Sequence, residues 1–156
     1  LPQLEGLRLA GKPLVPDVVT LDIGGNDVGV SQLSEEEFGE QVRAIIDRLP
    51  RPAYVADIPT FRPLKSEKRA SAMSALIEKA ARAAGVSVIH LEALSNTLTT
   101  FEYMVHYHAG DMFHPNSPWY HRWSQLFIDA MWSDLGVPSV DMEEVAPWEP
   151  WSALDR

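Results

Sequence analysis

The sequence predicts an α/β fold in which helices cover both faces of a parallel β-sheet. Three short apolar runs rich in β-branched residues alternate with three longer stretches of helical periodicity, as in repeated strand–helix units. Each apolar run is nearly continuous, which is typical of strands buried on both faces. The predicted strands are Val18–Ile23, Tyr54–Ile58 and Val86–Leu91.

The first predicted helix starts at Ser34 and ends before Pro50. The Ser34 hydroxyl can cap free backbone N–H groups while the Glu37 side chain reaches back, which together form a capping box. The apolar residues that follow recur at helical spacing, so they should face the sheet. They are Phe38, Val42, Ile45, Ile46 and Leu49.

Two further helices are predicted from the same kinds of signal. The second spans about 66–84, is closed by Gly85, and has a small apolar face that should lie close to the sheet. The third takes Ser117 as its N-cap and Pro118 as its first residue, and it ends at Gly136. Its inward residues should be Trp119, Trp123, Phe127, Ala130 and Met131.

Two segments fall outside this alternation. One is the 25-residue connection from Glu92 to Asn116, and connections of this length in compact domains tend to be functional or disordered. The other is a Trp- and Pro-rich tail over 137–156, which we expect to pack back on the domain formed by 1–136.

Composition excludes several classes of protein. The chain has 156 residues, 13 Lys and Arg against 22 Asp and Glu, a formal charge of −9 and no cysteine. This length suits one domain, and the absence of cysteine removes disulfide scaffolds, thiolate zinc sites and cysteine nucleophiles. The acidic balance disfavours nucleic acid as a partner. No apolar run approaches the ~20 residues of a membrane span.

Unusual residues follow the first and third predicted strands. Gly24-Gly25-Asn26-Asp27 ends the first, and the loop after the third closes with Asp111 to Asn116. In parallel sheets both loops open on the carboxyl edge, where ligands bind. Gly24 and Gly25 would allow close backbone approach by a substrate, and the Asn26 amide could donate to an oxyanion. The alternative for these residues is a purely structural turn.

Asp111 and His114 are spaced to form a catalytic pair. With Pro115 fixing the chain behind it, the carboxylate of Asp111 can accept from one ring nitrogen of His114 and orient the other as a general base. The alternative is that His114 is a surface or capping residue. A pair of this kind would need a hydroxyl nucleophile nearby.

The GGND turn and the DxxHP block, in this order, resemble two sequence blocks of the SGNH (GDSL-type) hydrolases over residues 16–136. The resemblance implies a three-layer flavodoxin-like fold with strand order 2-1-3-4-5, of which this chain supplies the last three strands. It implies a serine esterase or lipase that acts on a small carboxylic ester without a cofactor. In that enzyme Asn26 is the oxyanion donor, His114 the general base and Asp111 its orienting acid, while Gly24 matches the first glycine of the G-x-N-D block.

The departure from the family pattern concerns the nucleophile. The family's Gly-Asp-Ser block, and the glycine that gives a second oxyanion donor, do not occur in this sequence, and only about 15 residues precede the first strand. The chain also begins at Leu1 rather than Met. We therefore expect this chain to be the C-terminal part of the domain, with the serine on an N-terminal segment that is a separate or cleaved chain. Strand Val18–Ile23 would then be an exposed edge.

Several alternatives remain open at the level of sequence. Ser31 or Ser117 could replace the missing nucleophile, and the chain could be a non-catalytic binding module on the same fold. A metal site is a further possibility, if the stretch around His106 and His108 is extended. Its ligands would be His106, His108, Asp111 and His114. The 96–113 loop would line the substrate pocket, or cover the sheet edge, with Phe101, Tyr103, Met104 and Tyr107.

Overall fold

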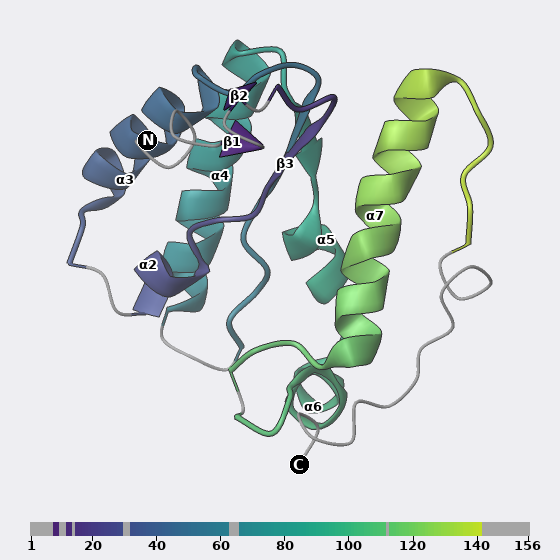
Figure 1. Cartoon of the computed structure of the whole chain (residues 1–156). Helices are drawn as coiled ribbons and strands as arrows, with labels where there is room; N and C mark the ends of the chain where they lie inside the picture. Colours follow the sequence, from purple (N-terminus) through teal and green to yellow (C-terminus); the bar gives the residue numbers. More distant parts are fainter. Residues whose placement is uncertain are drawn as a thin grey trace.

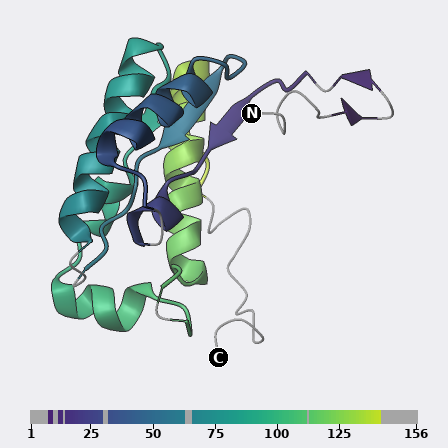
Figure 2. The ribbon, with the colours of Figure 1, turned by 90° about the vertical axis from the view of Figure 1, so that its left-hand side faces the viewer.

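The computed structural model describes residues 8–9, 12–13, 15–29, 32–62, 66–111 and 113–141. Three parallel strands form the sheet in the order β3-β4-β5, which confirms the predicted α/β class (Figure 1). The strands are β3 (Val19–Leu21), β4 (Ala53–Ala56) and β5 (Ser87–Ile89). A short antiparallel pair, β1 (Arg8–Leu9) and β2 (Lys12–Pro13), stands away from the sheet (Figure 2).

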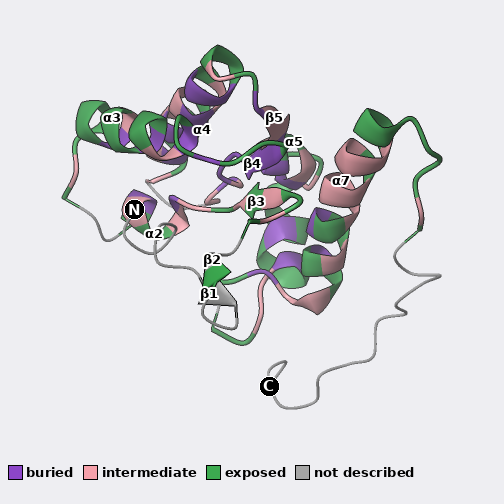
Figure 3. Ribbon diagram, turned by 45° about the horizontal axis from the view of Figure 1, so that its top comes forward, coloured by how far each residue is buried: buried purple, intermediate pink, exposed green. Residues whose placement is uncertain are grey.

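Helices cover both faces of this sheet, as predicted. Helices α3 (Glu35–Ile46) and α4 (Glu67–Ala83) lie on one face and α7 (Ser117–Leu135) on the other (Figure 3). Side chains alternate along β4, so Val55 enters the core with α3 and α4, whereas Tyr54 and Ala56 enter the core with α7. All four residues of β4 are buried, which makes it the centre of the three layers.

The capping signals predict α3 correctly and α7 with an error of one residue. Ser34 and Glu37 form the expected capping box. At α7 the prediction of Ser117 as N-cap is wrong, because Asn116 occupies that position and its side chain accepts from the N–H of Trp119 at 3.3 Å. The Asn116 amide also donates to the carbonyl of His106 at 2.6 Å, so one side chain both caps α7 and holds the preceding segment.

The long connection includes short helical elements. It contains α5 (Leu91–Ser95), α6 (Thr100–Glu102) and a π-helical turn, η1 (Tyr103–Tyr107). The start of the tail contacts α7, since Gln125 Nε2 donates to the carbonyl of Val140 at 2.9 Å. The predicted packing of the tail beyond residue 141 lies outside the described residues.

Strand β3 forms one edge of the sheet. Within the described residues β3 pairs on one side only, with β4, and Val18 just before it is 42% exposed. This agrees with the expectation of an exposed edge.

None of the described helices combines the length and the apolar character required to cross a membrane.

Gly24 shapes the turn between β3 and the short helix α2 (Gly25–Gly29). Its φ is +99°, and its carbonyl accepts from the N–H groups of Asp27 and Val28 at 3.0 and 3.2 Å. A Cβ at this position would lie 2.9 Å from Ile58 Cδ1 and 3.0 Å from Phe38 Cζ. Only glycine combines this conformation with such close packing, and Asn26 is placed by the turn that results.

Replacing Gly24 by alanine should therefore destabilise the fold. We expect Gly24→Ala to lower the free energy of unfolding by about 1–3 kcal/mol, because it adds backbone strain and a steric clash. Gly29→Ala is the matched control, since a Cβ there would meet no atom within 4 Å, and it should change stability by no more than about 0.5 kcal/mol. Urea denaturation of the two variants measures the difference; equal stabilities would contradict the assignment.

Candidate active site

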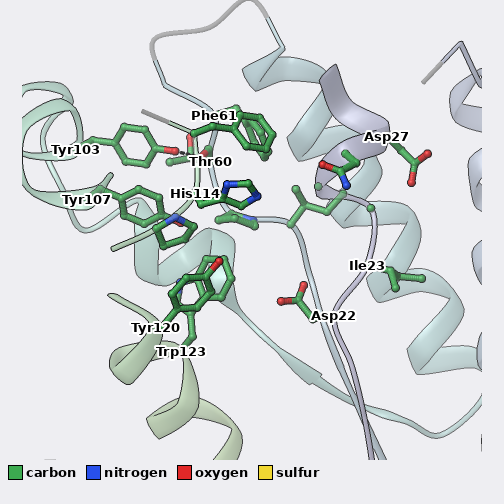
Figure 4. Close-up of a pocket in the computed structure, with 17 residues that line it drawn as sticks. Asp22, Ile23, Asp27, Thr60, Phe61, Tyr103, Tyr107, His114, Tyr120 and Trp123 are labelled. Carbon is green, nitrogen blue, oxygen red and sulfur yellow. Dashed lines mark hydrogen bonds between the residues drawn. The ribbon is translucent and has the colours of Figure 1, made fainter. Parts of the chain in front are cut away.

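A cavity of about 530 Å³ opens at the carboxyl end of the sheet. Its walls come from the turn after β3, the segment after β4, the η1 turn, the loop before α7, and α7 itself. Asn26 and His114, which are 88 positions apart in the sequence, both line it. Figure 4 shows His114 in the middle of the cavity, with Phe61, Tyr107 and Asp22 around it. The two sequence blocks predicted to share one edge of the sheet therefore meet at one cavity.

Asp111 and His114 form the predicted pair. Asp111 Oδ2 lies 2.5 Å from His114 Nδ1, and Asp111 Oδ1 accepts from the backbone N–H groups of Phe113 and His114 at 3.0 and 2.9 Å. The hydrogen bond from His114, followed by the two backbone hydrogen bonds, holds the pKa of the Asp111 carboxyl well below its usual range. A carboxylate on Nδ1 favours the tautomer with its proton there, which leaves Nε2 as the basic nitrogen.

Backbone pairing fixes the loop that carries this pair. The N–H of Ala109 donates to the carbonyl of His114 at 2.8 Å, and the N–H of Asn116 donates to the carbonyl of Tyr107 at 2.8 Å. His108 and Pro115 thereby form an antiparallel bridge. These bonds fix the backbone at His114, although its side chain is exposed.

Asn26 lies in the first turn of α2, directly after Gly24. Arg69 on α4 holds this helix in place, because its Nη2 donates to the carbonyls of Asp27 and Leu33 at 3.2 and 2.6 Å. Gly24 and Gly25 line the cavity together with Asn26. An exposed amide on a short, anchored turn is suited to donate to an oxygen atom of a bound molecule.

An aromatic wall faces the turn that carries Asn26. Tyr103 and Tyr107 line the cavity as predicted, with stacked rings 4.5 Å apart, and Tyr103 Oη donates to the carbonyl of Thr60 at 2.5 Å. Burial raises the pKa of both hydroxyls above the usual tyrosine range. Phe101 and Met104 are exposed and do not line the cavity, because they do not share the helix face of Tyr103 and Tyr107.

Some cavity residues were not predicted from the sequence. Phe61 follows β4, and its ring meets that of Phe113 edge to face, with ring centroids 5.8 Å apart. The rule that all strand ends open on one edge applies to β4 as well, so it could have identified Phe61. Phe113 ends the 96–113 loop that was expected to line the pocket, whereas no sequence signal identified Asp22, Tyr120 or Trp123 as cavity residues.

Two sequence alternatives find no geometric basis among the described residues. Ser117 starts α7 and does not line the cavity, and Ser31 lies outside the described residues. His106 belongs to the π-helical turn, so the extended stretch that would point His106 and His108 the same way is not formed. Among the described residues, no three of the four proposed ligands (His106, His108, Asp111 and His114) lie close enough to hold one metal ion.

Solved structures of two hydrolases are similar to this chain. The lipase/acylhydrolase from Enterococcus faecalis has a TM-score of 0.64 and 17% sequence identity, over 76% of this chain and 63% of its own. LAE5, an alpha/beta hydrolase enzyme from the metagenome of Lake Arreo, Spain, has a TM-score of 0.53 and 20% identity, over 78% of this chain and 60% of its own. At these identities the likeness concerns the fold. The chain spans less than two thirds of the length of either structure.

A comparison with curated proteins finds no match. A model of the GDSL-like lipase/acylhydrolase family, however, matches residues 1–122 of the 156. The matched region includes the turn at Gly24–Asp27 and the pair Asp111 and His114. This confirms the resemblance drawn from those two blocks: the chain belongs to the GDSL-like lipase/acylhydrolase family.

Proposed function

We propose that this chain supplies the general base, its orienting acid and an oxyanion donor of a serine hydrolase that acts on small carboxylic esters. The observation that carries the proposal is the 2.5 Å contact between His114 Nδ1 and Asp111 Oδ2, made where His114 lines a cavity together with Asn26. Membership of a lipase/acylhydrolase family supports the reaction class.

Each residue has a separate role in the proposed reaction. A serine hydroxyl attacks the ester carbonyl while His114 Nε2 takes its proton, and His114 then returns that proton to the leaving alcohol. Water hydrolyses the acyl-serine by the same route in reverse. Asp111 holds the imidazole and stabilises its protonated form, and the Asn26 amide donates to the oxyanion. These steps require no cofactor.

The serine is proposed to come from an N-terminal segment, supplied as a separate or cleaved chain. The sequence contains no Gly-Asp-Ser block, and the chain spans 63% and 60% of the two similar structures. Intact-mass analysis and a denaturing gel of an active preparation would test this origin. We expect a second polypeptide or a longer precursor; full esterase activity from this chain alone would overturn it.

Removing the general base should abolish turnover. In a preparation that contains the serine segment, we expect His114→Ala to reduce hydrolysis of a short p-nitrophenyl ester by about 10⁴-fold or more. His106→Ala is the matched control, because His106 is an exposed histidine that does not line the cavity, and it should retain activity. If the preparation has no turnover before mutation, a non-catalytic binding module is the better description.

Asn26 should contribute to kcat rather than to binding. Asn26→Asp keeps the size of the side chain but replaces its N–H donors by an acceptor, so we expect kcat to fall by about 10²–10³-fold while KM changes little. Steady-state kinetics on the same ester separates the two parameters. A rise in KM with unchanged kcat would show that Asn26 binds the substrate and does not stabilise the oxyanion.

The Asp111 carboxylate should also stabilise the fold in a pH-dependent way. Because its pKa is lower in the folded than in the unfolded chain, its contribution is present above the unfolded value of about 4 and is lost as the pH falls through the folded value. Asp111→Asn should therefore be less stable than the wild type at pH 5–7, with a difference that shrinks only below about pH 4. Denaturation at several pH values measures this; a difference that vanishes by pH 5 would contradict it.

A further inference from the structure

A second group of ionisable side chains lies near the carboxyl end of the sheet, outside the cavity. Asp57 directly follows β4, His90 directly follows β5, and Glu78 lies on α4. None of the three lines the cavity that holds His114. The proposed hydrolase mechanism uses none of them, so their arrangement needs a separate explanation.

Two of the three separations within this group match those of zinc ligands. His90 Nδ1 lies 3.3 Å from Asp57 Oδ2 and 3.5 Å from Glu78 Oε1, and the three ligand atoms lie within 4.8 Å of one another. In a tetrahedral zinc site with bonds of about 2.0–2.1 Å, neighbouring ligand atoms are about 3.3–3.5 Å apart. Both measured contacts therefore equal an edge of such a tetrahedron.

The carboxylates are oriented by contacts outside the group. Asp57 Oδ1 accepts from the backbone N–H of Glu92 at 2.8 Å, which leaves Oδ2 to face His90. Glu78 Oε2 lies 3.6 Å from Arg82 Nη2, which leaves Oε1 to face His90. Outer contacts of this kind position metal ligands before the ion binds.

One hydrogen on His90 Nδ1 cannot form good hydrogen bonds with both carboxylates. Nδ1 carries at most one hydrogen, whereas two carboxylate oxygens face it at distances longer than a good hydrogen bond. The Asp57 side chain is 2% exposed. A buried carboxylate beside a second one is costly unless a positive charge compensates it. A divalent cation would contact all three ligand atoms at once.

We propose that Asp57, Glu78 and His90 bind one Zn²⁺ ion, with water as the fourth ligand. Imidazole and carboxylate groups suit this ion, and the sequence has no cysteine thiolate to compete for it. His90 is 55% exposed and Glu78 34% exposed, so both the ion and a water molecule have access. The ion would link the ends of β4 and β5 to α4 and so stabilise the fold, independently of the hydrolase proposal.

Zinc titration of the metal-free chain tests this site. After treatment with EDTA and dialysis, calorimetry with ZnCl₂ at neutral pH should show one ion bound per chain, and zinc should raise Tm. His90→Gln and Glu78→Gln should each weaken zinc binding by more than about tenfold. Losing a residue that only positions a metal ligand already weakens binding about tenfold, and losing the ligand itself should cost more. Glu78 is partly exposed on a helix, so Glu78→Gln tests the site even if His90→Gln fails to fold.

His106→Gln is the matched control, because it changes an exposed histidine of the alternative metal cluster, and it should bind zinc as the wild type does. Absorption spectra with Co²⁺ in place of zinc should show tetrahedral coordination that both site variants lose. The proposal fails if the wild type binds no zinc, or if both site variants bind it unchanged. It also fails if His114→Gln removes the binding, since the ion would then lie at the candidate active site.

Discussion

The complete burial of β4 determines how the rest of the molecule is arranged. Residues 53–58 are all buried, and their side chains alternate between the core with α3 and α4 and the core with α7. Past the end of the strand, Asp57 meets Glu92 and His90, while Ile58 joins the core with α3 and α4 and lines the cavity. One buried strand thus supports two candidate sites that lie apart from each other.

The geometry of the Asp111–His114 pair depends on the loop that carries it more than on either side chain. Asp111 binds two backbone N–H groups of its own loop, and the loop is closed by pairing between His108 and Pro115. Asn116 then joins this loop to both η1 and α7. The orientation of His114 is therefore set by local hydrogen bonds and by the start of a long helix, which allows an exposed imidazole to keep a fixed direction.

Sequence predicted the elements whose signals are local. Ser34 with Glu37, and Asp111 with His114, each act within four residues, so spacing alone was sufficient to identify them. It did not predict the π-helical turn, because the choice between π and extended geometry depends on packing of Tyr103 and Tyr107 against α7 and β4. It also did not predict that Asp57, Glu78 and His90 converge, since they come from three separate elements.

The free edge of β3 is compatible with the proposed origin of the serine. Within the described residues this edge is unpaired, and Asp22, which follows β3, lines the cavity. A strand that pairs with β3 in parallel would end at the same edge of the sheet. The residue that follows such a strand could then enter the cavity. It would lie between the turn that carries Asn26 and α7, within reach of His114. Such a strand would also cover Val18, whose exposure would otherwise leave an apolar strand edge open to aggregation.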